Sequence, residues 1–217
     1  MKMTPNFKSA VVIGAFNPMI LTPDFLSKHC GFDSNEKPAG QTTPIASEIR
    51  FGDTHFLVEL NKFQIALRNL DSFESPLPWN LTVRYLEVLQ YTPLQMAGIN
   101  LNYTLTDFNT VALKKLLGDM HRIGDILKVE PSSISLAANS TESRGMELTE
   151  VAVVCQMDSD IKNNIKFSFG ASEVIVNNNF EVAGLDTDRQ RFLLISGRHD
   201  EMIRTNTRFL GLITQIG

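Results

Sequence analysis

The sequence predicts an α+β protein in which a curved antiparallel sheet carries its helices on one face. Three observations predict this class. Short runs of alternating apolar and polar residues are separated by tight-turn dipeptides, which is typical of an antiparallel meander. Stretches with apolar residues at helical spacing follow these runs. The order strand, helix, three strands, helix then starts again in the second half of the 217-residue chain.

The first predicted unit is a strand that leads into a short helix. Residues 7–17 are rich in Val, Ile and Phe and form the strand, which ends at Pro18 because proline cannot donate a hydrogen bond to a neighbouring strand. Thr22 is the expected N-cap of the helix, and Gly31 is its expected end. A polar loop over residues 32–43 follows.

A tight meander and a second helix complete the first half. Its three strands are predicted at residues 45–51, 54–60 and 63–70. Apolar and polar side chains alternate along them, so one face is buried and the other is wetter, as in a sheet with helices on one side only. Residues 71–79 are predicted to be a loop, and an amphipathic helix runs from about Leu81 to a point before Pro93.

The second half repeats this order with longer strands. A strand over residues 94–105 is predicted to lead into a helix that Asp107 or Asn109 caps and Gly124 ends. The following strands are expected at residues 132–138, 147–157 and 165–176.

The end of the chain is less uniform. The stretch SEVIVNNNFEV, residues 172–182, is predicted to form a hairpin because asparagine tolerates left-handed backbone conformations. Residues 191–196 form either a last strand or the start of a helix, and a closing helix is predicted over residues 199–216.

The repeated order resembles the duplicated βαββββα arrangement of TATA-binding-protein-like domains, although only four strands are visible in the first half. The resemblance covers most of the chain, rests on element order, and places Gly14 opposite Gly98 in the two copies. It implies one continuous curved sheet, with helices on its convex side, built from two pseudo-symmetric halves at residues 1–91 and 92–217. It carries over no functional residue, because the paired intercalating phenylalanines of the DNA-binding family have no counterpart here.

Composition and charge exclude several classes of protein. The net charge is −4 at pH 7, and the two halves carry −1 and −3. Neither half has the excess of Lys and Arg that sequence-independent binding of nucleic acid requires, although a local basic face stays open. Cys30 and Cys155 are far apart and are predicted to be free thiols of a reducing compartment. No apolar run of about 18 residues occurs, so we expect a cytoplasmic protein that does not enter a membrane.

The familiar catalytic and cofactor motifs do not occur in the sequence. There is no phosphate-binding loop, dinucleotide fingerprint, nucleophile elbow or paired-histidine zinc motif. His29-Cys30 lies at a predicted helix C-terminus, which disfavours a thiolate. We therefore expect no catalytic residue, no cofactor and no metal, and the sequence favours a non-enzymatic protein.

An arginine-rich segment is the first candidate binding site. It contains Arg189, Arg191, Arg198, Arg204 and Arg208. These side chains suit phosphate or a carboxylate-bearing partner, and nucleic-acid binding is the corresponding hypothesis. Aspartates and glutamates are interleaved with them, so the alternative is a solvated face held by local ion pairs.

The wetter face of the sheet is the second candidate site. Its predicted binding residues are Gln64, Arg68, Asn100 and Asn102. Trp79 and Phe73 are either exposed recognition anchors or part of the packing under the following helix. The main hypothesis is a binding or assembly protein that uses the curved sheet face or a sheet edge for a protein partner or for a second copy of itself. A small-ligand or enzymatic pocket between sheet and helices is a further alternative.

Overall fold

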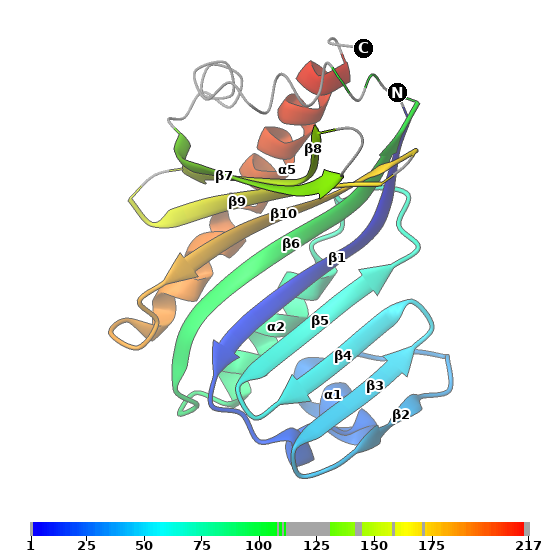
Figure 1. Cartoon of the computed structure of the whole chain (residues 1–217). Coiled ribbons are helices and arrows are strands. Elements are labelled where there is room, and N and C mark those ends of the chain that lie inside the picture. Colours follow the sequence, from blue (N-terminus) through cyan, green and yellow to red (C-terminus); the bar gives the residue numbers. More distant parts are fainter. Residues whose placement is uncertain are drawn as a thin grey trace.

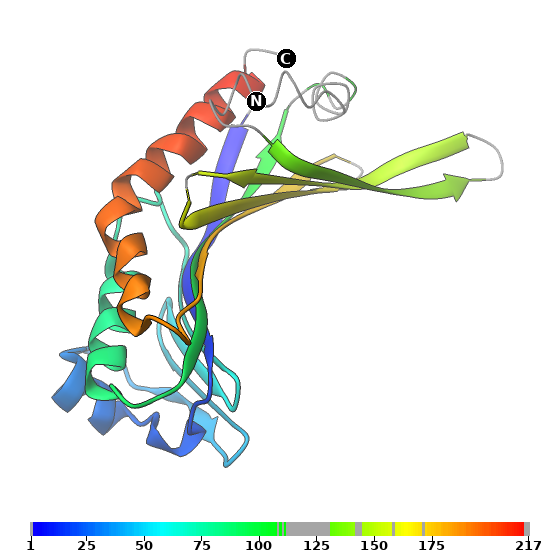
Figure 2. The same cartoon turned by 90° about the vertical axis from the view of Figure 1, so that its left-hand side faces the viewer.

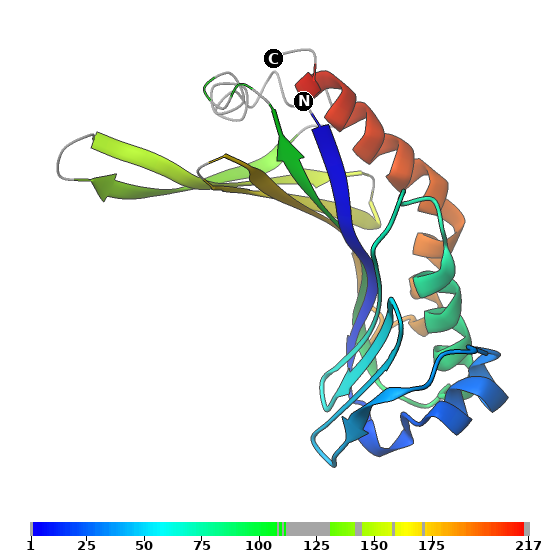
Figure 3. The ribbon, with the colours of Figure 1, turned by 90° about the vertical axis from the view of Figure 1, so that its right-hand side faces the viewer.

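The computed structural model describes residues 2–107, 109, 111, 131–141, 145–157, 159–170 and 172–214. Within them, ten strands form one antiparallel sheet in the order β2-β3-β4-β5-β1-β6-β10-β9-β8-β7 (Figure 1). The sheet is curved, and its helices cover only one side (Figures 2 and 3). The predicted α+β class is therefore confirmed.

The first half of the chain supplies one side of the sheet. Its elements are β1 (Lys2–Gly14), η1 (Pro18–Ile20), α1 (Pro23–Cys30), β2 (Ala39–Thr42), β3 (Ala46–Phe51), β4 (Thr54–Glu59), β5 (Lys62–Arg68) and α2 (Leu77–Val88). The predicted ends of α1 are confirmed. The Thr22 hydroxyl accepts a hydrogen bond from the Phe25 N–H, and Gly31 ends the helix with a φ of 60° that a left-handed cap requires.

The second half supplies the other side. Its elements are β6 (Leu94–Thr106), β7 (Pro131–Thr141), β8 (Gly145–Gln156), β9 (Ile161–Phe169), β10 (Val174–Ala183), η2 (Arg189–Phe192) and α5 (Leu193–Thr214). The helix predicted after Asp107 or Asn109 lies almost entirely outside the described residues.

The strand order is mirrored about the central pair β1–β6. Outward from β1 the strands are β5, β4, β3 and β2, and outward from β6 they are β10, β9, β8 and β7. The resemblance to TATA-binding-protein-like domains implies one continuous curved sheet, and a common origin of the two halves stays a prediction. The suggested match between Gly14 and Gly98 is wrong, because Gly14 is the last residue of β1 and Gly98 lies inside β6, opposite Val11.

The hydrophobic core lies between the sheet and the helices on its convex side. Alternate residues of the central strands point into it, such as Ala10 and Val12 of β1 and Ile99 and Leu101 of β6. Helix α2 packs on β5 and β1, and α5 packs on β10. The opposite side of the sheet is concave and carries no helix among the described elements (Figure 2).

Several predicted boundaries differ from the structure. Residues 32–43 contain β2, an exposed strand without an alternating apolar pattern that only its pairing with β3 defines. Helix α2 begins at Leu77 rather than near Leu81, so Trp79 is helical and not in a loop. Residues 191–196 form the end of η2 and the first turn of α5, and not a strand.

The predicted hairpin in residues 172–182 is also wrong. These residues belong to one continuous strand, β10, and the turn before it is closed by the Gly170 N–H, which donates to the Glu173 carbonyl at 2.8 Å. Asparagine is tolerated inside the strand because its side chains alternate between the two faces. Asn178 points into the core, where it donates to Asn206 at 3.0 Å.

Candidate functional site

The concave face is the side of the sheet that points away from the helices. Because Ala10 and Val12 of β1 are buried under the helices, Ser9 and Val11, which alternate with them, point to the concave side. Residues paired across neighbouring strands share a face, so the strand registers assign the concave side chains of the other strands.

Six asparagines gather on the concave face of β1, β6, β10 and β9. They are Asn6, Asn100, Asn102, Asn164, Asn177 and Asn179, and we call them the amide cluster. In one row across the sheet, Asn100 pairs with Asn179, and Asn179 pairs with Asn164. All six side chains are partly exposed. The centre of the concave face is therefore an uncharged, hydrogen-bonding surface.

Local hydrogen bonds hold part of the amide cluster in place. The Asn6 amide donates to Oδ1 of Asn102 at 2.8 Å and to Oγ1 of Thr104 at 3.0 Å, across a bulge in β1. The Asn100 amide points at Oγ of Ser9 at 3.4 Å. Each primary amide offers two N–H donors and an oxygen with two lone pairs, so the cluster can both donate to a ligand and accept from it.

Charged side chains flank the amide cluster and are largely paired. On one side Lys162 lies 3.5 Å from Glu181, and Lys166 lies 2.7 Å from Glu150. On the other side Lys62 lies 2.8 Å from Glu59. Opposite charges side by side leave little net field for a highly charged ligand.

Glu48 on β3 contacts two basic side chains of this face. Its carboxylate binds the Arg50 guanidinium and lies 3.0 Å from Nε2 of His55. The hydrogen bond from Arg50 lowers the pKa of Glu48, and burial lowers the pKa of His55. His55 is therefore neutral at pH 7, and Glu48 is ionised.

A small hollow lies beside the amide cluster at Gly98. Its volume is about 100 Å³, and Val11, Met96, Asn179 and Glu181 contribute to its lining. A Cβ at Gly98 would lie 2.8 Å from the carbonyl oxygen of Phe180, so the approach of β10 excludes any larger residue there. The hollow has the size of one small side chain.

The four sheet-face residues singled out in the sequence all fall on the concave side. Asn100 and Asn102 lie in the middle of the amide cluster. Gln64 pairs with Val11 on one side and with Leu57 on the other, and Arg68 lies at the exposed end of β5, opposite Phe7.

Sequence reasoning missed four members of the amide cluster. They are Asn6, Asn164, Asn177 and Asn179. The signal that could have found Asn177 and Asn179 is the period-two pattern of Val174, Val176, Phe180 and Val182, which continues through the asparagines.

The described arginines of the arginine-rich segment contact different partners. Arg189 donates to the backbone carbonyls of Leu86 at 2.7 Å, Leu89 at 2.9 Å and Thr92. These groups include the last carbonyls of α2, which lack partners within the helix. Burial lowers the pKa of Arg189, yet arginine stays charged. Its position indicates a structural role.

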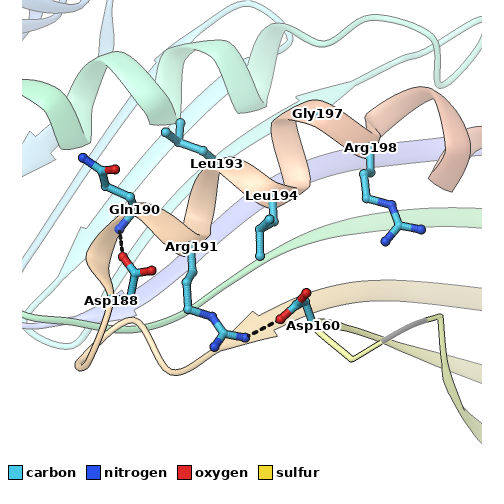
Figure 4. Close-up of a pocket in the computed structure, with 8 residues that line it drawn as sticks. All are labelled: Asp160, Asp188, Gln190, Arg191, Leu193, Leu194, Gly197 and Arg198. Carbon is cyan, nitrogen blue, oxygen red and sulfur yellow. Dashed lines mark hydrogen bonds and ion pairs between the residues drawn. The ribbon is translucent and has the colours of Figure 1, made fainter.

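Two other arginines line a shallow cavity of about 550 Å³ beside the first turns of α5 (Figure 4). Arg191 binds Asp160 at 3.0 Å, and Arg198 forms a two-pronged bond to Glu201 at 2.8 and 2.9 Å. Arg204 is exposed further along α5, and the side chain of Arg208 lies outside the described residues. Acidic side chains thus pair with both arginines that line this cavity.

A buried lysine joins three elements on the helix side of the sheet. Lys8 is 1% exposed, and its ammonium donates to the carbonyls of Phe73 at 2.7 Å and Ser75 at 2.8 Å and contacts Nε2 of His199. These contacts use all three N–H donors of the ammonium. Nδ1 of His199 lies 3.4 Å from the Asp200 carboxylate. Lys8 therefore connects β1, the loop before α2 and α5.

The other candidate residues are part of the packing. Trp79 and Phe73 are 1% and 5% exposed, so they are not exposed anchors. Cys30 is buried, and burial raises the pKa of its thiol to about 11, which makes it a poor nucleophile. Among the described residues, no group of three His, Cys, Asp or Glu could hold a metal ion.

Comparisons with known proteins assign no family. No family model and no curated protein matches the chain. Of the solved structures, a de novo designed protein, TMB2.3, aligns at 9% identity and a TM-score of 0.18, covering 84% of this chain and 98% of its own. DynU16, from the dynemicin biosynthetic locus, aligns at 8% identity and a TM-score of 0.30, covering 98% and 99%. Scores this low carry no argument about fold or function.

A membrane-spanning helix must be both long and apolar, and no helix among the described residues combines the two properties.

Proposed function

We propose that this chain is a non-enzymatic binding protein whose concave face receives a protein partner. The amide cluster is the observation that carries the proposal. Six neutral amides on one curved surface match the N–H and C=O groups of a polypeptide, which need both acceptors and donors.

The balance of charge favours a protein over a nucleic acid on this face. Its described side chains include six cations, at Lys2, Arg50, Lys62, Arg68, Lys162 and Lys166. They also include four carboxylates, at Glu48, Glu59, Glu150 and Glu181. Phosphate backbones are bound by a clear excess of Lys and Arg, which this face lacks.

The arginine-rich segment gives weaker support to nucleic-acid binding. Arg189, Arg191 and Arg198 already contact carbonyl or carboxylate oxygens, so binding phosphate there would break existing contacts.

The cavity beside α5 is the place where the small-ligand alternative would bind its ligand. The buried thiol of Cys30 agrees with a reducing compartment, and we include a cytoplasmic location in the proposal.

Site-specific photocrosslinking tests this function. The photoreactive amino acid p-benzoylphenylalanine replaces Asn177 at the centre of the concave face, and in a matched control it replaces the exposed Arg204 on the opposite side. After irradiation in cells, the expected result is a discrete protein adduct from position 177 and none from position 204. Adducts only from position 204, or adducts that nuclease removes, would contradict the proposal.

A further inference from the structure

The two edges of the sheet differ sharply. β2 has four residues, all exposed, and includes Gly40 at a φ of 146°. Short, irregular edge strands resist pairing with other chains. β7 has eleven residues and pairs with β8 along its whole length, with irregularities only between Pro131 and Ser133 and between Ala137 and Ala138. No described strand pairs with its outer side.

The sequence of β7, PSSISLAANST, contains no charged residue. Edge strands are usually protected from association by lysines, by inward-pointing charges or by a covering loop or helix. The outer edge of β7 is therefore long and uncharged, and no described strand pairs with it, so its backbone N–H and C=O groups are available to pair with another strand.

The outer part of the β7–β8 hairpin has no third strand beside it. β9 pairs with β8 only from Glu150 to Gln156, whereas β7 and β8 pair on to Thr141 and Gly145. The hairpin accordingly projects from the body of the molecule (Figures 2 and 3). An isolated two-stranded ribbon is marginally stable in water, so a further strand would stabilise it.

We propose that β7 pairs antiparallel with β7 of a second copy of this chain, across a two-fold axis near residue 136. When a strand pairs antiparallel with its own copy, identical residues lie near one another, so like charges on the strand repel across the interface. β7 carries no charged residue and avoids this repulsion. The chain already contains a junction of this type at β1–β6, where two five-stranded halves meet antiparallel. The dimer would contain one continuous sheet, and the concave face of each copy would stay open for the proposed protein partner.

The test measures oligomeric state by sedimentation equilibrium from about 5 to 200 μM. The native chain is expected at twice its 24.3 kDa monomer mass. Ser135→Lys places two lysines on diagonally neighbouring positions across the axis, about 7–8 Å apart, and should weaken the dimer at least tenfold. Ser168→Lys is the matched control, because Ser168 lies on β9, inside the sheet, and this variant should remain dimeric.

Hydrogen exchange on the native chain provides a readout that needs no variant. Protection of β7 amides should increase with protein concentration, while protection in β2 should not. A native chain that stays monomeric at 200 μM, or a dimer that Ser135→Lys leaves intact, would overturn the proposal. A dimer dispersed by Ser168→Lys alone would also overturn it and would point to the concave face. Crosslinking from position 177 tests that face separately, so the two proposals fail independently.

Discussion

The buried ammonium of Lys8 should make the stability of this protein rise with pH. Burial lowers the pKa of Lys8 from its ordinary 10.5 to about 8, and the Asp200 carboxylate only partly opposes the shift. Between these two values the unfolded chain binds more protons than the folded chain, so raising the pH favours folding. Below about pH 8 the side chain is charged in both states, and its contribution is constant.

The size of the effect follows from the two pKa values. Going from pH 7 to pH 9.5 should add about 2 kcal/mol to the free energy of unfolding, from 1.36 kcal/mol per pKa unit. The neutral amine keeps two N–H donors for the Phe73 and Ser75 carbonyls, so losing the charge does not orphan them.

The measurement is urea unfolding of the native chain and of Lys8→Met at pH 7.0, 8.25 and 9.5. Cys30 acts in the opposite direction: its folded pKa is raised to about 11, and it destabilises the fold above its ordinary value of 9.0. That contribution is common to both proteins and cancels in their difference. The native chain should gain about 2 kcal/mol over Lys8→Met across this range. A difference that stays flat or falls would refute a charged, desolvated Lys8.

Three further substitutions test the structure. Arg189→Gln removes the donor to three carbonyls and should cost about 2 kcal/mol in urea unfolding, whereas Arg204→Gln on the exposed face of α5 should stay within about 0.5 kcal/mol. Tyr85→Phe removes a buried hydroxyl without a hydrogen-bond partner in the described chain; the melting temperature should hold or rise, and a clear fall would reveal a missed partner. Asn206→Ala leaves the buried amide of Asn178 without its hydrogen-bond acceptor and should lower the free energy of unfolding by about 2 kcal/mol. The double variant, with alanine at both 178 and 206, should lose less than the sum of the two single variants.

Local chemistry explains why some elements were predictable. The cap at Thr22 and the stop at Gly31 depend on neighbouring backbone groups, so the sequence places helix α1 correctly. The strand β4 and the first part of β5 alternate because one of their faces is buried, and this period of two also places Gln64 and Arg68 on the concave side.

Elements that depend on distant partners were not predictable in the same way. β2 has no apolar pattern and exists through its pairing with β3. The run Asn177 to Asn179 favours a turn by local propensity, yet it lies inside β10, because Asn178 has a buried partner on α5 and the other two face solvent.

The sequence alone determined the fold class, the alternation of strands and helices, and the slightly acidic net charge, because these follow from short-range periodicity and composition. Tertiary structure alone decided which polar side chains meet. It brought six asparagines from four strands onto one face, used Arg189 to hold the end of α2, and buried Lys8 against His199, 191 positions away. The physical reason is that strand register and helix docking create these contacts, and both depend on pairing between residues far apart in the chain.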